Sequence, residues 1–342
     1  DRLCHHLHIS NFQHFPDEDG WLFLNMTPEV FLQAKSIRNE ESLGRMLGTL
    51  DFSPHRLVIE VLEESVKNQQ EFESAVAFFR EMGCLIALDD FGAGSSNFDR
   101  VWKIRPQIVK LDRNLIVQAA EQKRIRRLLP QIVSLLHEAG AMVLAEGVET
   151  EEQGYIALDS DIDFVQGYLL GRPQSRLAQR GNAEMVIDDL WTSFETRMKQ
   201  DRTQHKQALA PYLNAIGYAA VLLSAGRSLA EASASFLELP LSDFSYLLDQ
   251  HGRQVGLNHW APHAKPNIDP RLAPLADTRG SRWSRRPYFR RAVENFGKAQ
   301  VTRPYLSSSS ADLCVTVSAS FKLNGKVHVV CGDVRIPQHL FD

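Results

Sequence analysis

Two adjacent carboxylates, Asp89 and Asp90, follow an apolar run at residues 84–88 and precede a turn containing Gly92 and Gly94. The apolar run is typical of a buried parallel strand, and the glycines permit a tight turn and close approach of the backbone to a ligand. Because successive side chains of a strand alternate between its faces, we expect the two carboxylates to point to opposite sides of the chain. The stretch predicts a metal site at the carboxyl end of a strand in an α/β barrel. An acidic N-cap of the next helix is the alternative.

The neighbouring sequence repeats this arrangement. Strands are expected at residues 21–25, 56–60, 84–89, 108–112, 141–146 and 164–168, and helices at residues 28–47, 69–82, 121–139 and 151–158. This alternation predicts a parallel sheet with right-handed crossovers. Each strand carries a polar residue at or near its carboxyl end, in order Asn25, Glu60, Asp89, Lys110, Glu146 and Gln166. In a barrel such ends converge on one face, and helix capping does not explain Lys, Gln or Asn within strands.

The residue types at these strand ends favour phosphoryl chemistry. Asn25, Glu60, Asp89 and Glu146 offer hard oxygen ligands, which suit Mg²⁺ or Mn²⁺. No His or Cys accompanies them, so zinc is not expected. Asp90 could hold or bridge a second ion, and two ions about 3.5–4 Å apart stabilise the attacking and leaving oxygens of a phosphoryl displacement. Lys110 could orient the attacking water or neutralise developing charge. A salt bridge between Lys110 and a neighbouring acid is a compatible alternative.

These residues lie in motifs that resemble those of EAL domains, the cyclic di-GMP phosphodiesterases of bacteria, over about residues 1–175. In chain order the motifs are Leu24-Asn25-Met-Thr, Glu60-Val-Leu-Glu63, Asp89-Asp90-Phe-Gly-Ala-Gly, Lys110-Leu-Asp112, Ala145-Glu146-Gly-Val-Glu149-Thr and Gln166-Gly-Tyr-Leu-Leu-Gly-Arg172-Pro173. The resemblance implies a modified TIM barrel that hydrolyses cyclic di-GMP to linear pGpG with two Mg²⁺ or Mn²⁺ ions. It also implies a homodimer.

The resemblance assigns a role to each motif residue. It makes Asn25, Glu60, Asp89, Asp90 and Glu146 the metal ligands, with Asp90 on the second ion. Gln166 and Asp90 would contact the substrate. Lys110 would hold the nucleophilic water and belongs, with Glu146 and Glu63, to the catalytic set. Glu63 would fix the loop after Asp90, which couples the metal site to the dimer interface.

The sequence departs from the family pattern in two places. The Glu-Ala-Leu signature is expected some tens of residues before Asn25, and the first 24 residues do not contain it. We therefore expect either that the first strands of the barrel are absent from this chain or that the domain is catalytically degenerate. A degenerate domain would act as a cyclic di-GMP receptor or signalling scaffold. The loop after Asp90 has Ser95 where the family has Tyr, so its coupling to the dimer could differ.

The second half of the sequence has a different pattern of predicted helices and strands. We expect linking helices at residues 181–238, which separate the barrel at 1–180 from a second domain at 239–342. Strands predicted near 244–248, 300–302, 313–321 and 326–334, with a hairpin at Asn324-Gly325, resemble a PAS-like or Cache-like α+β sensor domain. An arginine-rich stretch at residues 282–291 predicts either a site for a carboxylate or phosphate ligand or a solvated helix face. An unidentified small ligand is expected at Arg286, Tyr288 and Asp333, with Trp283 nearby.

Composition limits the other possibilities. The 342 residues carry a formal net charge of −4, which is not the electrostatic signature of a general nucleic-acid binder. No apolar run approaches the length of a membrane span. Cys4, Cys84, Cys314 and Cys331 are scattered, which favours reduced thiols in a cytoplasmic protein.

Overall fold

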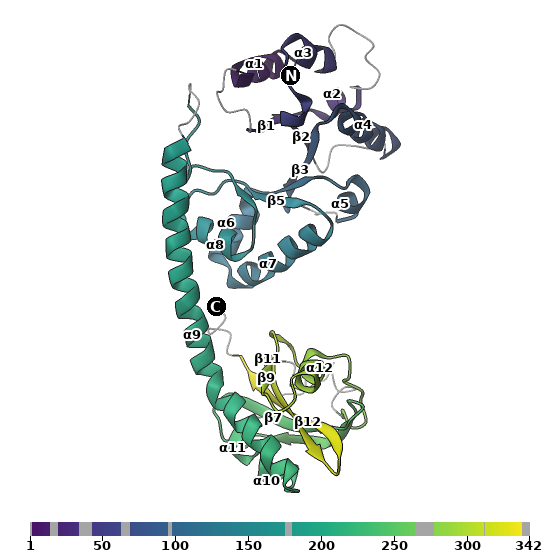
Figure 1. Cartoon of the computed structure of the whole chain (residues 1–342), viewed down its shortest axis with the longest axis vertical. Helices are drawn as coiled ribbons and strands as arrows, with labels where there is room; N and C mark the ends of the chain where they lie inside the picture. The colour runs from purple at the N-terminus through teal and green to yellow at the C-terminus, as the bar shows by residue number, and fades with distance from the viewer. Residues whose placement is uncertain are drawn as a thin grey trace. The chain divides into compact units, whose positions relative to one another are not determined.

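A computed structural model describes residues 2–13, 20–33, 43–62, 69–94, 98–174, 180–264, 277–310 and 312–336. The chain divides into two compact units, Asp1–Arg197 and Met198–Asp342, and the division falls inside the long helix α9 (Arg180–Ser224) (Figure 1). Each unit has its own hydrophobic core. The limits predicted for the barrel, the linking helices and the second domain stay predictions.

The first unit alternates strands and helices, as the sequence predicts. Its strands are β1 (Leu22–Asn25), β2 (Leu57–Leu62), β3 (Leu85–Phe91), β4 (Ile108–Leu111), β5 (Met142–Ala145) and β6 (Phe164–Val165). Its helices before α9 are α1 (Arg2–Gln13), α2 (Pro28–Gln33), α3 (Leu43–Thr49), α4 (Gln69–Met82), α5 (Phe98–Ile104), α6 (Arg113–Glu121), α7 (Lys123–Glu138) and α8 (Glu151–Asp159).

Two helical predictions differ from the structure. The helix predicted at 121–139 is preceded by a separate helix, α6, which begins because the Asp112 carboxylate accepts a hydrogen bond from the backbone N–H of Asn114 at 2.9 Å. The helix predicted at 28–47 is seen as α2 and α3, and residues 34–42 between them lie outside the described residues.

The six strands form one parallel sheet in chain order, from β1 to β6. The rings of Trp21, just before β1, and Phe164, in β6, lie 5.9 Å apart, although their strands are at opposite edges of the sheet. The sheet is therefore strongly curled, and the described strands form a half-barrel. This confirms the α/β class and the parallel topology.

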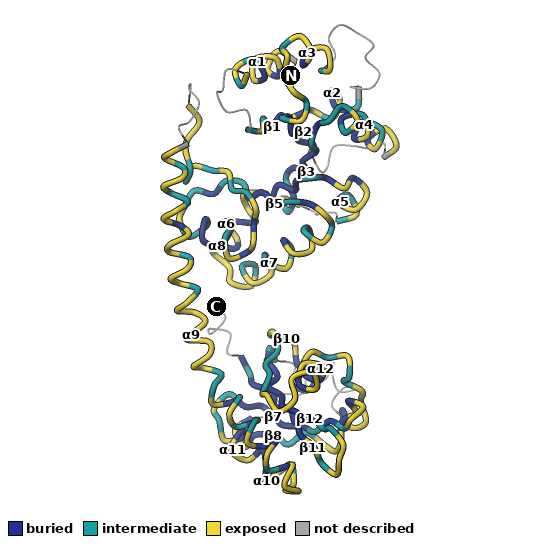
Figure 2. Tube along the Cα trace, in the orientation of Figure 1, coloured by how far each residue is buried: buried dark blue, intermediate teal, exposed yellow. Residues whose placement is uncertain are grey.

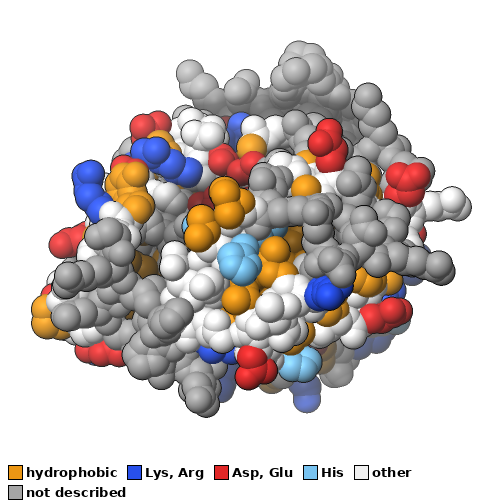
Figure 3. All heavy atoms as spheres, turned by 90° about the horizontal axis from the view of Figure 1, so that it is seen from above, with side chains coloured by type: hydrophobic (Ala, Val, Ile, Leu, Met, Phe, Trp, Pro, Cys, Tyr) orange, Lys and Arg blue, Asp and Glu red, His pale blue; other side chains and the backbone are white. Residues whose placement is uncertain are grey.

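The two faces of this sheet bury different sets of side chains. The larger core lies between the outer face and the helices, and contains strand residues such as Ile59, Leu88 and Val143. The concave face carries a small cluster of Val58, Ala87, Ile108 and Leu144. The strands are buried while the helices expose their outer sides (Figure 2). On the face seen in Figure 3, acidic, basic and hydrophobic side chains of the described residues are interspersed.

The second unit is built on an antiparallel sheet. Its elements after α9 are α10 (Leu229–Ala232), α11 (Ala234–Leu237), β7 (Ser242–Leu248), β8 (Gln254–Trp260), α12 (Pro287–Glu294), β9 (Gln300–Val301), β10 (Tyr305–Leu306), β11 (Leu313–Leu323) and β12 (Lys326–Arg335). The strand order is β10-β11-β12-β7-β8, and β9 also pairs with β11. One face packs on α9 and α11, and the other packs on α12.

The predicted hairpin at Asn324-Gly325 is confirmed, with both residues at positive φ (49° and 75°), as a tight turn between twisted strands requires. The linking helices predicted over residues 181–238 are observed as α9, α10 and α11, with a break near Gly226, where φ is 81°. An α+β second unit is thus observed, and its PAS-like or Cache-like identity stays a prediction. Cys84, Cys314 and Cys331 are buried free thiols. None of the described helices combines the length and apolarity that a membrane crossing requires.

Candidate functional site

The candidate site follows from the two-residue period of the strands. Four side chains of the concave face form a small apolar cluster, Val58, Ala87, Ile108 and Leu144. Because side chains two residues apart share a face of a strand, the next side chains on this face come from Glu60, Asp89, Lys110 and Glu146. The polar layer therefore lies directly beyond the apolar layer, toward the carboxyl ends of four adjacent strands.

Lys110 stands at the centre of this polar layer. Its Nζ lies 2.8 Å from Oε1 of Glu60 and 2.9 Å from Oδ1 of Asp89, and it also contacts Oε1 of Glu146. Lys110 and Glu60 are each 3% exposed and Asp89 is 7% exposed, so little water screens these charges. One buried ammonium group thus faces three carboxylates. The predicted salt bridge is confirmed, and three acids take part in it.

The prediction that Asp89 and Asp90 point to opposite sides of the chain is wrong. Carboxylate oxygens of Asp89, Asp90 and Glu146 all lie within 4.8 Å of one another, so the two aspartates point to the same place. The reason is a β-bulge: Leu88 pairs with Val109 and Phe91 with Leu111, so one extra residue of β3 is fitted between them. Asp90 has a φ of 55°, a left-handed conformation that turns its side chain toward the cluster.

Burial and Lys110 have opposite effects on the pKa values of the neighbouring carboxyl groups. Burial raises the pKa of the Glu60 carboxyl and that of Glu146, and hydrogen bonds from Lys110 oppose the rise in both. Burial also acts to lower the pKa of Lys110, but its hydrogen bonds to Glu146 and Glu60 outweigh this effect and raise the pKa above the ordinary value. Lys110 is therefore charged at neutral pH and stabilises the ionised acids.

The cluster has the properties of a divalent-metal site. Glu60, Asp89, Asp90 and Glu146 together carry more negative charge than Lys110 neutralises. Oδ1 of Asp89 is buried and accepts no well-aligned hydrogen bond, although Nζ of Lys110 is near. Hard carboxylate oxygens of this kind suit Mg²⁺, Mn²⁺ or Ca²⁺. The residues present therefore fit a divalent cation.

The structure places the remaining predicted residues outside this contact group. Asn25 ends β1, aligned with Glu60 in the parallel register, and is exposed. Gln166 follows β6, where its backbone N–H donates to the carbonyl of Ala145, and its exposed side chain makes no hydrogen bond to the described residues. Glu63 and Ser95 lie outside the described residues, so their predicted roles stay predictions.

Two positioning features escape the sequence patterns. Nε2 of His5, in α1, donates to the backbone carbonyl of Asn25 at 2.9 Å and so holds the end of β1. Burial lowers the pKa of His5, which keeps the ring neutral for this role. At the other edge, Gly167 lies so close to Val148 that an added Cβ would be 2.1 Å from the Val148 carbonyl oxygen. The Gln166-Gly167 pair could have suggested this close approach, whereas nothing in the sequence singles out His5.

The first unit is thus an α/β half-barrel with an acidic, lysine-centred cluster at the carboxyl ends of its strands. The chain belongs to the EAL domain family, whose model matches residues 2–173, half of the chain.

Curated relatives of the chain include cyclic di-GMP phosphodiesterases. PdeF of Escherichia coli is 29% identical over 152 residues, which are 44% of this chain and 20% of PdeF. RocR of Pseudomonas aeruginosa is 31% identical over 135 residues, 39% of this chain and 34% of RocR. The chain therefore spans only a fifth to a third of these relatives.

A solved structure extends the likeness in fold to both units. The Bacillus subtilis YkuI protein, with an EAL domain, in complex with cyclic di-GMP and calcium, matches with a TM-score of 0.74 at 19% identity. The match covers 96% of this chain and 81% of YkuI.

Proposed function

We propose that this chain hydrolyses cyclic di-GMP to linear pGpG in a reaction that requires Mg²⁺ or Mn²⁺. The observation that carries the proposal is the cluster of Glu60, Asp89, Asp90 and Glu146 around Lys110, in a chain whose family relatives include cyclic di-GMP phosphodiesterases. The charge of this cluster is unbalanced without further cations, and a phosphodiester with bound metal would balance it.

In the proposed reaction a water oxygen forms a bond to one phosphorus of cyclic di-GMP. The bond from that phosphorus to the ribose 3′ oxygen breaks, the 3′ oxygen takes up a proton, and the product keeps a 5′-phosphate. Divalent cations, two in our proposal, supply electrostatic stabilisation to the phosphate oxygens.

The residues that would hold the cations are Asn25, Glu60, Asp89, Asp90 and Glu146. Lys110 would orient the water and stabilise negative charge that develops on the phosphoryl group. Its three carboxylate contacts hold its ammonium group in one position, which is the pre-organisation that this role requires. Gln166 and Asp90 would contact the substrate.

We also propose that the chain works as a cytoplasmic homodimer whose second unit regulates the site. In this proposal Glu63 fixes the loop after Asp90, and that loop couples the site to the partner subunit. The bulge at Asp89 and Asp90 supports such coupling, because a strained left-handed residue responds to any movement of the loop that follows it.

A second candidate is a receptor that binds cyclic di-GMP without cleaving it. The acidic cluster around Lys110 would hold the metal ions and the phosphodiester in this case too. Incubation of the protein with cyclic di-GMP and Mn²⁺, followed by chromatography, separates the two. Formation of pGpG supports the enzyme, whereas tight binding without product supports the receptor and refutes the enzyme.

A further inference from the structure

A small cavity in the second unit lies against β7, β12 and α12. Its volume is about 30 Å³, and its walls include Tyr246, Trp283, Tyr288 and Tyr305. Two charged residues, Arg286 and Asp333, line the same cavity. A water needs about 10–15 Å³ of such space, so the cavity has room for a molecule of a few heavy atoms.

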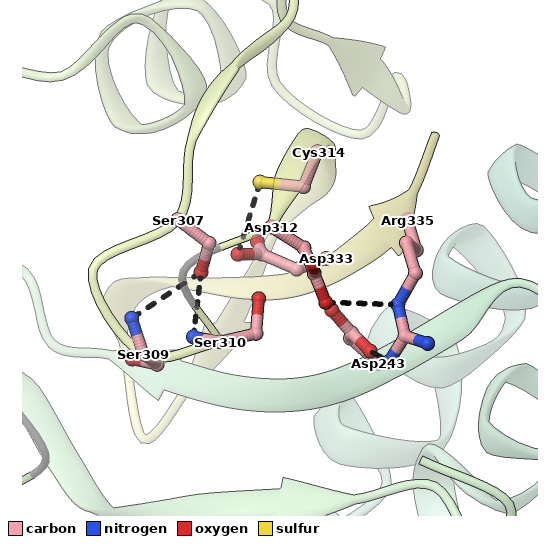
Figure 4. Close-up of polar contacts among 8 residues, drawn as sticks. All are labelled: Asp243, Ser307, Ser309, Ser310, Asp312, Cys314, Asp333 and Arg335. Carbon is pink, nitrogen blue, oxygen red and sulfur yellow. Dashed lines mark hydrogen bonds and ion pairs between the residues drawn. The ribbon is translucent and has the colours of Figure 1, made fainter. Parts of the chain in front are cut away.

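Asp333 supplies a buried carboxylate that lacks a counter-charge among the described residues. It is 2% exposed, and it accepts hydrogen bonds from Oγ1 of Thr316 at 2.8 Å and from Sγ of Cys314 at 3.6 Å. The neighbouring cation, Arg335, pairs instead with Asp243 and Asp312 (Figure 4). Among the described residues no cation pairs with Asp333. Burial raises the pKa of Asp333 to about 7, and hydrogen bonds from Thr316 and Cys314 only partly oppose this effect.

Arg286 supplies a cation that no carboxylate in the described part of the chain neutralises. It is the residue before α12, and its guanidinium group lies 5.9 Å from the centre of the Tyr305 ring. Its Nε is buried and has no hydrogen-bond partner, and no carboxylate of the described residues pairs with it. Arg286 and Asp333 do not pair with each other, so the cavity separates two opposite charges.

Four other polar side chains of the wall are joined by hydrogen bonds. Nε1 of Trp283 donates to Oε1 of Gln254 at 3.2 Å, Nε2 of Gln254 donates to Oδ1 of Asn258 at 2.7 Å, and Nδ2 of Asn258 donates to Oγ of Ser309 at 3.3 Å. Neither Arg286 nor Asp333 takes part in these bonds, and both remain charged groups without a charged partner among the described residues. Buried charges without partners are costly, which favours a ligand that supplies both partners.

We propose that this cavity binds a small molecule that carries both a carboxylate and a protonated amine, such as glycine or alanine. The ligand carboxylate pairs with Arg286, and the ligand ammonium group pairs with Asp333. Both contacts are charge-assisted hydrogen bonds, the stronger kind. The tyrosine and tryptophan rings cover the short aliphatic part and attract the ammonium group through their faces. The inference does not rest on the phosphodiesterase proposal, because it concerns binding to the second unit alone.

Isothermal titration calorimetry on the full chain tests this assignment with glycine and L-alanine as probes. Acetate and methylamine serve as matched ligands that carry only one of the two groups. Loss of one charge-assisted contact should weaken binding about tenfold or more. Equal affinity for acetate and alanine, or absence of heat with both amino acids at millimolar concentration, would overturn the proposal.

Variants locate the site. Arg286→Gln and Asp333→Asn should each weaken alanine binding about tenfold or more. Arg290→Gln, which changes an exposed arginine of α12, should leave alanine binding unchanged. Arg286 is only half-buried, so its variant keeps the test valid if Asp333→Asn fails to fold. Wild-type affinity in Arg286→Gln would refute the assignment.

Discussion

Replacement of Lys110 by Met removes the central charge of the acidic cluster and keeps most of the side-chain volume. Removal of one partner of a buried ion pair costs about 3–5 kcal/mol. Lys110 is 3% exposed and contacts three carboxylates, so we expect a loss at the upper end of this range in chelator-treated protein. Protonation of Glu60 and Glu146, whose pKa values burial already raises, limits the loss.

Hydrogen exchange of peptides that cover β2 to β4 measures this effect within the first unit, because exchange reports local stability. Protection should fall by roughly three to four powers of ten, since each 1.4 kcal/mol is about tenfold. The control is Lys103→Met, which breaks a half-exposed pair of 2.6 Å with Asp99 and should cost only about 0.3–0.5 kcal/mol. A loss in Lys110→Met no larger than in this control would refute the proposed electrostatic role.

Three further predictions concern single residues. Burial raises the pKa of Asp333 to about 7 in the folded protein, whereas the pKa of an unfolded Asp is ~3.9. At pH values between these two, the Asp333 carboxyl is protonated in the folded state and ionised in the unfolded state. Wild-type stability should therefore fall relative to Asp333→Asn as pH rises through this window, by up to about 1.4 kcal/mol per pH unit, and a pH-independent difference in denaturation midpoint would contradict this. Asp90→Asn should fold normally, because Asn tolerates the left-handed φ of 55°, and it should lose pGpG formation, because one carboxylate of the cluster is gone. Asp90→Val should lower the free energy of unfolding by about 1–3 kcal/mol, because a β-branched residue is strained at this φ. Equal denaturation midpoints of the two variants would argue against backbone strain. Gly167→Ala should lower the melting temperature because its Cβ would clash with the Val148 carbonyl, and an unchanged melting temperature would show that the two loops move apart freely.

The position of the polar layer could be predicted from the sequence for a physical reason. Parallel strands of a barrel point their carboxyl ends the same way, so Glu60, Lys110 and Glu146 had to meet once the strands were recognised. The apolar residues two positions earlier, such as Val58 and Ile108, fix which face they share.

The sequence could not show the details that depend on register. The bulge that brings Asp90 beside Asp89 arises from the pairing of β3 with β4, and nothing in either strand alone specifies it. Likewise, the arginine-rich stretch before and within α12 predicts a ligand site, but only packing decides that Arg286 lines a cavity while Arg290 is exposed. The side chains of Asn25 and Gln166 are exposed although Phe23 and Phe164, two residues earlier, pack against the apolar cluster of the concave face, because β1 and β6 are the edge strands of the described sheet.

The most direct test of the central claim compares Glu146→Gln with Glu149→Gln in the presence of cyclic di-GMP and Mn²⁺. Glu146 contacts Lys110 and lies within the carboxylate cluster, whereas Glu149, in the same loop, pairs with the exposed Arg113 at 3.2 Å. We predict that Glu146→Gln binds cyclic di-GMP but forms no pGpG, and that Glu149→Gln keeps the wild-type rate. Wild-type production of pGpG by Glu146→Gln would contradict the assignment of the cluster as the catalytic site.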